Sequence, residues 1–426
     1  MILTSICRTT ALCLIGLGSF SGLAAHAADW PQWRGPRRDG VSTETGLLRQ
    51  WPPEGPKLLW SVTGLGAGYS SPAIAKGRIY LTGRVEKQEK LSVFDLSGRL
   101  QWEKTYGNAT RRPFPEARTT PTVQDGAVYV ISGAGEVVCL DAAKGTVAWS
   151  VDGFGQFAGK HGSWGTAESP LLADDKVIYT PAGSQTTVVA LDRRTGKTVW
   201  TSKSLGDQSA YVSPILISVG GRRQVVAVTG NYILGVNAAD GTIDWQVRYG
   251  DIGATEDGAD IEANTPLFHD SRIYVTSGYN HTGVMLQLAR DGRGANVAWV
   301  DPTLDTHHGH VVLVDGHLYG SNWINNRKGN WVSVDWLTGK PGYETEWFTK
   351  GSMISAEGRL YCYEERQGNL ALVKADPREF SVIGSFRIAQ GEGPHWAHPA
   401  ISDGRLYVRH GDVLMAYDIK APAAAK

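Results

Sequence analysis

A Ser/Thr-Pro step that returns about every 47 residues constrains the fold of this 426-residue chain more than any other feature. Its intact copies are Ser71-Pro72, Thr120-Pro121, Ser169-Pro170, Ser213-Pro214 and Thr265-Pro266. Altered copies follow around His310, at Ser352-Met353 and at His398-Pro399. A regular period of this length is typical of arrays in which one supersecondary unit repeats. The chain therefore contains eight units, counting the altered copies.

Each unit also carries short runs rich in β-branched and aromatic residues, such as 77–81 and 272–275, which predict strands. Three units share an acidic or amide residue, a glycine four positions later and a tryptophan four positions after that: Asp141, Gly145, Trp149; Asp192, Gly196, Trp200; Asn237, Gly241, Trp245. The glycine supplies the positive φ of a hairpin turn, so the signature marks the bend between a third and a fourth strand. Four antiparallel strands per unit predict an all-β, eight-bladed β-propeller.

The two ends of the repeat array are complementary. Residues 58–60 resemble a fourth strand with no first three before them, whereas the last unit stops after the third strand at 414–418. We therefore expect the N-terminal strand to complete the last blade and remove two free sheet edges. Two separate β-sandwiches would need a linker near the middle of the chain, and the sequence has no such break.

The predicted boundaries follow from this closure. Residues 1–27 form a signal peptide, 28–56 an N-terminal strap, 57–420 one propeller and 421–426 a flexible tail. The first segment has Arg8 as its only charge, an apolar run and the small-residue sequence Ala25-His26-Ala27, so we expect export to the periplasm or beyond after cleavage at Ala27. After cleavage no transmembrane anchor is expected.

The net charge limits the classes of expected partner, and the cysteines raise the question of a disulfide bond. The 42 Lys and Arg balance the 42 Asp and Glu, which removes the long-range attraction to phosphate backbones and makes nucleic acid an unexpected partner. Cys139 and Cys362 remain in the mature chain, each within a strand-like run. They could pair in an oxidising compartment, but buried free thiols are the favoured interpretation. We expect a monomer.

With these repeats and this signature, the chain resembles the PQQ-like (quinoprotein-type) β-propeller family. That family includes the BamB-type outer-membrane assembly factors and, more distantly, the quinoprotein alcohol dehydrogenases. The resemblance covers residues 58–418 and is weakest in the fifth and seventh units. It implies that the signature tryptophans dock between neighbouring blades: Trp102, Trp149, Trp200, Trp245 and Trp299. Residues 29–40 resemble the opening of many secreted members, and we expect this strap to pack on the propeller surface.

In a propeller, the innermost strand of every blade begins at the mouth of the central channel, so the residues before each repeat step converge. They are Tyr69, Ser70, Arg118, Thr119, Glu168, Tyr211, Glu262, Asn264, His307, His308, His310, Ser352, His395, Trp396 and His398. Convergent polar, titratable and aromatic groups are typical of a binding or active site. A water-filled channel with a polar lining is the simpler alternative.

Two sets of these residues suggest enzymatic functions. Glu168 and Asn264 resemble the carboxylate and amide that hold Ca²⁺ beneath the quinone in the dehydrogenases, with Arg118 facing PQQ and Trp396 stacking on it. This resemblance implies a PQQ- and Ca-dependent oxidoreductase acting on alcohols or sugars. We do not favour it, because the family's vicinal cysteine pair and a haem-attachment motif are missing.

A second enzymatic interpretation uses the histidines. His308, His310 and His398 could bind a transition metal, or a histidine with Tyr211 or Arg118 could abstract a proton from a polysaccharide. The favoured function is a third one, a binding or assembly scaffold of the cell envelope. Its expected partner is an envelope protein, or a saccharide or small molecule at the propeller mouth.

Overall fold

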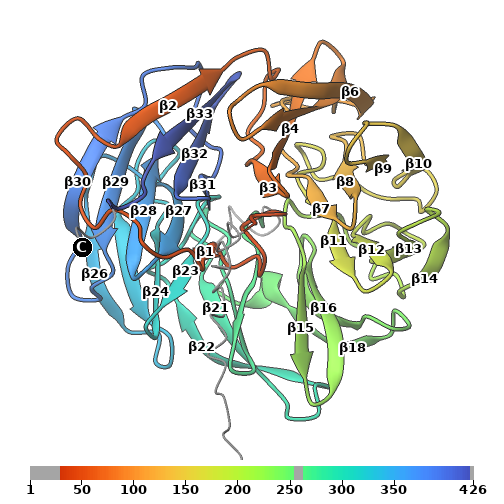
Figure 1. Cartoon of the computed structure of the whole chain (residues 1–426). Helices are drawn as coiled ribbons and strands as arrows, with labels where there is room; N and C mark the ends of the chain where they lie inside the picture. Colours follow the sequence, from red (N-terminus) through yellow and green to blue (C-terminus); the bar gives the residue numbers. More distant parts are fainter. Residues whose placement is uncertain (1–28, 254–261, 423–426) are drawn as a thin grey trace, which may run out of the picture.

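The computed structural model describes residues 29–253 and 262–422, which form eight blades of four antiparallel strands around a central channel (Figure 1). Seven blades follow the chain order from an inner strand near the channel to an outer strand at the perimeter, and the seventh blade carries a short parallel fifth strand at its inner edge. The eighth takes its outer strand from the N-terminal part of the chain. This confirms the predicted eight-bladed, all-β propeller. Within the described residues, helical structure is limited to one 3-10 turn, η1 (Tyr249–Asp251).

The first four blades come from residues 73–248. They contain β3 (Ala73–Ala75), β4 (Arg78–Val85), β5 (Gln88–Asp95) and β6 (Leu100–Asn108); β7 (Thr122–Gln124), β8 (Ala127–Ile131), β9 (Glu136–Asp141) and β10 (Val147–Asp152); β11 (Leu171–Ala173), β12 (Lys176–Tyr179), β13 (Val189–Asp192) and β14 (Thr198–Thr201); β15 (Ile215–Val219), β16 (Arg222–Val228), β17 (Tyr232–Asn237) and β18 (Ile243–Arg248).

The remaining blades come from residues 267–418 together with two N-terminal strands. They contain β19 (Leu267–His269), β20 (Arg272–Val275), β21 (Gly283–Leu288) and β22 (Ala295–Asp301); β23 (Val312–Val314), β24 (His317–Ser321), β25 (Trp331–Asp335) and β26 (Pro341–Thr345); β27 (Gly351–Ala356), β28 (Arg359–Glu364), β29 (Asn369–Lys374) and β30 (Ser381–Arg387), with β1 (Val41–Ser42) on the inner edge; β31 (Ala400–Ser402), β32 (Arg405–His410), β33 (Val413–Asp418) and β2 (Lys57–Val62).

The N-terminal strand closes the ring as predicted. Strand β2 pairs antiparallel with β33, with Lys57 opposite Asp418 and Val62 opposite Leu414. The eighth blade is therefore assembled from both ends of the chain, and the two edges that an open array would leave are paired.

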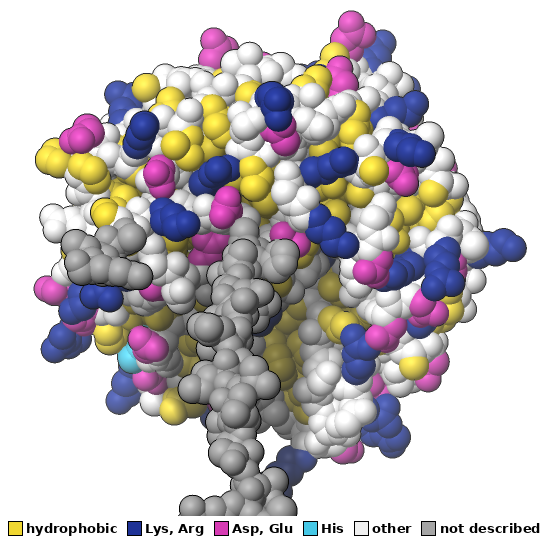
Figure 2. Space-filling view, in the orientation of Figure 1, with side chains coloured by type: hydrophobic (Ala, Val, Ile, Leu, Met, Phe, Trp, Pro, Cys, Tyr) yellow, Lys and Arg dark blue, Asp and Glu magenta, His cyan; other side chains and the backbone are white. Residues whose placement is uncertain are grey.

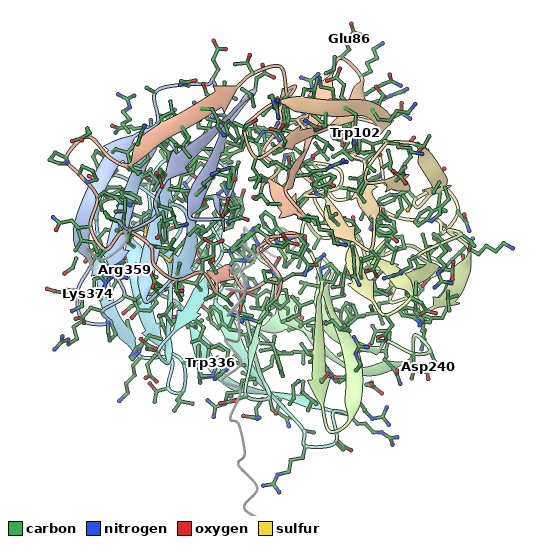
Figure 3. The ribbon with its side chains drawn as sticks, viewed as in Figure 1. Glu86, Trp102, Asp240, Trp336, Arg359 and Lys374 are labelled. Atoms are coloured by element: carbon green, nitrogen blue, oxygen red, sulfur yellow. The ribbon has the colours of Figure 1, made fainter. Side chains whose placement is uncertain are left out.

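Central strands are buried on both faces because each blade lies between two others. In β9, Val137, Val138, Cys139 and Leu140 are all buried, whereas in the outer strand β10 only Trp149 is. The core therefore comes mainly from the central strands, and an outer strand such as β10 contributes its signature tryptophan. Figure 3 shows side chains filling the space between the ribbons, with labelled Glu86 and Asp240 at the periphery.

Four of the five signature tryptophans, Trp102, Trp149, Trp200 and Trp299, dock on the turn glycine of the next blade, as the family resemblance implied. Trp245 instead lies over Gly235 of its own blade and donates its indole N–H to Gln224. Trp149 lies over Gly196 of the following hairpin turn and donates its indole N–H to the Arg193 carbonyl at 3.0 Å. A Cβ on Gly196 would lie 2.8 Å from the Trp149 ring, and Gly196 has a φ of 71°. This glycine therefore serves both the turn and the close approach between blades. Trp102 lies over Gly145 in the same way one blade earlier, but its buried indole N–H makes no hydrogen bond within the described residues.

The strap lies elsewhere than expected. Its residues 29–40, which we call the channel plug, enter the central channel instead of packing on the outer surface, and they appear at the centre of Figure 1. Trp30 exchanges backbone hydrogen bonds with Ile74 of the first blade, and Gly40 accepts one from Ser355 of the seventh. Trp30 is fully buried.

Two arginines anchor the channel plug to the inner strands. Arg38 donates to the carbonyls of Ser169 (3.2 Å), Pro214 (3.0 Å) and Pro170, and Arg34 donates to that of Val311. Both guanidinium groups are buried, and burial lowers the pKa of Arg38 to about 9 and that of Arg34 to about 10. Both pKa values remain above neutral pH, so each arginine binds the strand carbonyls as a cation.

Other expectations concern the thiols and the surface. Cys139 and Cys362 are buried free thiols, which confirms the favoured interpretation. Basic and acidic side chains interleave over the face shown in Figure 2. Among the described residues, no helix is long and apolar enough to span a membrane. The predicted signal peptide lies outside those residues.

Candidate functional site

A cavity of about 400 Å³ opens at one end of the channel, and we call it the cup. Its lining comes from loops of nearly all blades: Trp33, Tyr69, Phe114, Arg118, Trp164, Ala167, Tyr211, Ser213, Ala263, Tyr279, His307, His308, His310, Asn326, Glu365, Trp396 and His398. Trp33 belongs to the channel plug, so the plug closes the cup at its base.

The walls of the cup are largely aromatic. Trp396 packs edge-on against Tyr69, with ring centroids 4.9 Å apart, and also against Phe114 at the rim. On another side Trp164 packs against Tyr211 at 5.4 Å. These contacts hold large, amphipathic rings in fixed positions around the opening.

A histidine network occupies the base of the cup. The backbone carbonyl of His308 lies 2.9 Å from His310 Nδ1 and 3.0 Å from His398 Nε2. A carbonyl only accepts, so these two nitrogens carry the protons, and the opposite ring nitrogens, His310 Nε2 and His398 Nδ1, have lone pairs without a partner. Burial lowers the pKa of both imidazoles well below the usual range and keeps them neutral. Trp33 packs edge-on against both rings.

Asn264 holds the histidine loop in place. Its side-chain amide donates to the carbonyls of Thr306 (2.5 Å) and His307 (3.0 Å), and its Oδ1 accepts from the backbone N–H of His310 at 3.1 Å. His310 has a φ of 59°, in the left-handed region that non-glycine residues rarely adopt. The loop between β22 and β23 is thus kept in an unfavourable backbone conformation by side-chain contacts.

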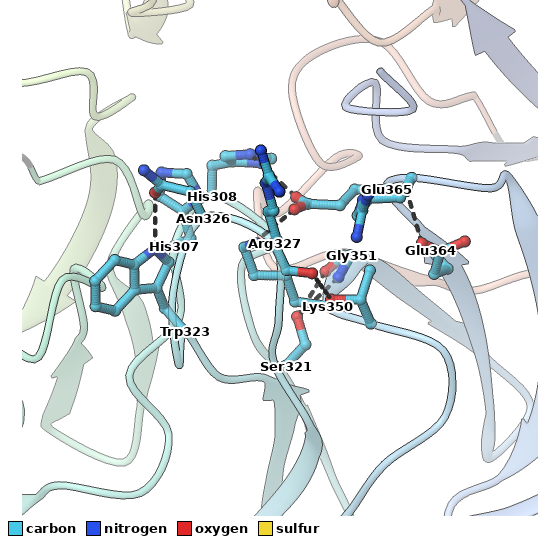
Figure 4. Close-up of polar contacts among 12 residues, drawn as sticks. His307, His308, Ser321, Trp323, Asn326, Arg327, Lys350, Gly351, Glu364 and Glu365 are labelled. Carbon is cyan, nitrogen blue, oxygen red and sulfur yellow. Dashed lines mark hydrogen bonds and ion pairs between the residues drawn. The ribbon is translucent and has the colours of Figure 1, made fainter. Parts of the chain in front are cut away.

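A second cluster lies beside this network, between the sixth and seventh blades (Figure 4). The Glu365 carboxylate receives Lys350 Nζ on Oε1 at 2.6 Å, and its Oε2 lies 3.5 Å from His308 Nε2. His307 Nε2 lies 2.8 Å from the Tyr279 hydroxyl. Burial, together with the Lys350 charge, lowers the pKa of His308 to about 4, so this imidazole is neutral at pH 7.

Arg118 is the one arginine or lysine among the described cup-lining residues. Burial lowers the pKa of its guanidinium, which donates to the Trp164 carbonyl. Its Nε–H is buried and has no partner. The arginine is therefore held on one side and retains a donor for a ligand.

Six of the eight predicted site residues line the cup together: Arg118, Tyr211, His308, His310, Trp396 and His398. Glu168 and Asn264 do not line it. Both carboxylate oxygens of Glu168 accept from Thr180, one from its N–H and one from its hydroxyl. Burial raises the pKa of Glu168 to about 8, so the protonated form predominates at pH 7.

The positions of Glu168 and Asn264 test the hypothesis that they hold Ca²⁺ beneath PQQ. A Ca²⁺ ion takes six to eight oxygen ligands, most often ionised carboxylates and carbonyls. Here both Glu168 oxygens already accept hydrogen bonds from Thr180, and the Asn264 oxygen already accepts from His310. These residues do not fit a Ca²⁺ ion beneath PQQ, and we derive no chemistry through that cofactor.

The transition-metal group also differs in membership from the expected one. Across residues 29–253 and 262–422, three ligand atoms within 4.8 Å of one another come from His307, His308 and Glu365. Sequence reasoning missed Glu365 because it considered only the loop that precedes each inner strand. Glu365, Tyr279 and Asn326 follow the second strand of their blades, and antiparallel pairing brings those loops to the same end of the channel. The signal was available in the Glu364-Glu365 pair directly after a buried strand.

Comparison with known proteins places this chain in a family. The profile of the family described as outer membrane protein assembly factor BamB matches residues 87–341, more than half of the chain. The chain belongs to this family. Membership confirms the resemblance drawn from the repeats, and the structure is that of a BamB-family propeller.

Individual relatives of this BamB-family chain are distant. The outer membrane protein assembly factor BamB of Kangiella koreensis (strain DSM 16069 / JCM 12317 / KCTC 12182 / SW-125) is 24% identical over 224 residues, 51% of this chain and 50% of that protein. The chain thus spans about half the length of this curated relative. The crystal structure of BamB from Moraxella catarrhalis is 16% identical, with a TM-score of 0.61 over 87% of this chain and 99% of that one. A europium-containing methanol dehydrogenase, 12% identical over 90% of each chain, has a TM-score of 0.67. The structural likenesses show the fold alone.

Proposed function

We propose that this BamB-family propeller is a binding scaffold of the cell envelope, exported by its signal peptide, and that its partner is an envelope protein docked over the cup. The observation that carries the proposal is the aromatic wall around a closed base. Tyrosine, tryptophan and arginine are enriched among the residues that contribute most to protein–protein binding. The cup presents Tyr69, Trp164, Tyr211, Trp396 and Arg118 together.

The closed base favours binding over passage. The channel plug lies below the cup, with Arg34 and Arg38 bonded to backbone carbonyls of four different blades. A second cavity of about 800 Å³ lies beside the plug, between it and strands β11, β15 and β19. A side chain or loop of a partner can enter the cup from one side only. Family membership supports an assembly role, because the matching family is described as an outer-membrane assembly factor.

Photo-crosslinking in the native host tests this proposal with the full-length chain. A photoreactive amino acid replaces Phe114, which is 48% exposed at the rim of the cup. The matched control replaces Leu337, an exposed apolar residue in the turn between β25 and β26, at the opposite end of the propeller. We expect a crosslink to an envelope protein from position 114 and not from position 337, and we expect Trp396→Ala to remove it.

Two outcomes would contradict the proposal that the protein is a binding scaffold. One is the absence of any product from position 114, and the other is the same products from both positions. A product that contains saccharide instead of protein would replace the protein partner with a sugar ligand.

A further inference from the structure

The cluster of His307, His308 and Glu365 combines the ligand types of a transition-metal site. Each offers one ligand atom, and the three atoms lie within 4.8 Å of one another. The 3.5 Å between His308 Nε2 and Glu365 Oε2 is close to the separation of roughly 3.4 Å that two ligands have in a tetrahedral site with metal–ligand bonds of about 2.1 Å. His308 and Glu365 therefore need little movement to share an ion, and the His307 ring closes the remaining distance of at most 4.8 Å on binding.

Unpartnered ring nitrogens point to a ligand at this position. His307 Nδ1 and His308 Nε2 are buried and make no hydrogen bond within the described chain. A buried polar atom left without a partner costs about 1–3 kcal/mol. A metal ion accepts such lone pairs directly, because the ring nitrogen of a histidine is a common metal ligand.

The neighbouring side chains hold the three ligands as the outer residues of metal sites do. Lys350 Nζ binds Oε1 of Glu365 at 2.6 Å and also donates to the Asn325 carbonyl at 3.1 Å, which leaves Oε2 facing His308. The Tyr279 hydroxyl lies 2.8 Å from His307 Nε2 and fixes that ring. Such contacts orient metal ligands, and their loss typically weakens binding about 10–100-fold. The Lys350 charge opposes a cation, so we expect moderate affinity.

The cluster also has an open side. All three residues line the cup, and the Trp396 ring lies 5.3 Å from that of His308. Three protein ligands leave a fourth position of a tetrahedral ion directed toward other molecules, which is the arrangement of exchangeable rather than purely structural zinc.

We propose that His307, His308 and Glu365 bind one divalent transition-metal ion, best matched by Zn²⁺, with an open coordination position facing the cup. Two imidazoles and one carboxylate suit Zn²⁺ and disfavour Ca²⁺, which takes oxygen ligands. This site extends beyond the scaffold proposal and does not depend on it, because metal binding is measured on purified protein and partner capture on intact cells.

Calorimetric titration of the purified mature chain with Zn²⁺, after chelator treatment, tests the site. We expect one ion per chain and no saturable binding of Ca²⁺. His308→Ala is expected to weaken Zn²⁺ binding at least about tenfold, and His307→Ala is the second variant should the first fail to fold. His269→Ala is the matched control, because this exposed histidine is the last residue of β19 and lies outside the cup.

The titration has clear contrary results. The proposal is wrong if wild type binds no stoichiometric Zn²⁺, if His307→Ala and His308→Ala bind as wild type does, or if His269→Ala loses the ion. Tyr279→Phe separates orientation from ligation, since it should weaken binding without abolishing it. Preference for Ca²⁺ over Zn²⁺ would also overturn the assignment.

Discussion

The two ends of the central channel are built from the same eight blades and yet differ in how their polar groups are satisfied. In the channel plug, the Arg38 guanidinium donates to three strand carbonyls. In the cup, Arg118 has an unpartnered Nε–H, and His310 and His398 each have a free ring nitrogen. The difference teaches that buried polar groups with full partners serve the fold, whereas unpartnered groups facing a cavity mark binding.

The largest expected effect is a loss of stability when the channel plug loses the Arg38 side chain. Arg38→Ala leaves the carbonyls of Ser169 and Pro214 without this donor, whereas that of Pro170 keeps the Thr122 hydroxyl. We expect the free energy of unfolding to fall by about 3 kcal/mol. Arg37→Ala is the matched control, because the neighbouring side chain is exposed and forms only a surface ion pair with Asp39. Its expected effect is below about 0.5 kcal/mol. Urea denaturation measures both, and equal losses would contradict a structural plug.

The second effect is the pH dependence of stability caused by Glu168, a buried carboxyl near Arg38. Burial raises the pKa of Glu168 to about 8, against an ordinary value near 4.5. The stability that the protonated carboxyl contributes is therefore full below pH 4.5 and is lost as pH rises toward 8. Even half of this shift corresponds to a loss on the order of 2 kcal/mol.

Glu168→Gln is expected to flatten the melting temperature between pH 5 and pH 8, whereas the surface control Glu103→Gln keeps the wild-type slope. Thermal melts across this range supply the measurement. An unchanged slope in Glu168→Gln would show that burial does not raise the pKa of Glu168 in the folded protein.

The smallest effect belongs to the open end. Arg118→Ala removes a guanidinium whose described acceptor is the Trp164 carbonyl, so we expect a loss of only about 1 kcal/mol by urea denaturation. A loss as large as that of Arg38→Ala would mean that the cup arginine is structural too, and the contrast between the ends would fail.

Most of the fold could be predicted from the sequence because it repeats. The Ser/Thr-Pro steps and the Asp-x-x-x-Gly-x-x-x-Trp signature encode local turns and the docking of blades, and these physical requirements recur in each unit. The orphan strand at 58–60 revealed the closure of the ring. By contrast, the strap occurs once, so no repetition indicated that Arg34 and Arg38 would reach into the channel.

The site was predictable in outline for the same reason. Residues before each inner strand share one topological position, and six of the eight candidates accordingly line one cup. Which way each side chain turns depends on contacts from other blades. Asn264 turns toward the His307–His310 loop, and Glu168 toward Thr180. Glu365 comes from a different loop class, whose convergence depends on strand lengths that the sequence left uncertain.

One thermal-shift series tests the contrast between the two ends most directly, with wild type, Arg38→Ala and His308→Ala each melted with and without Zn²⁺. A ligand that binds only the folded state raises the melting temperature. We predict that Arg38→Ala melts well below wild type but keeps the Zn²⁺-induced rise, and that His308→Ala melts near wild type but loses it. The account is contradicted if His308→Ala keeps the rise, or if Arg38→Ala loses the rise while melting as wild type does.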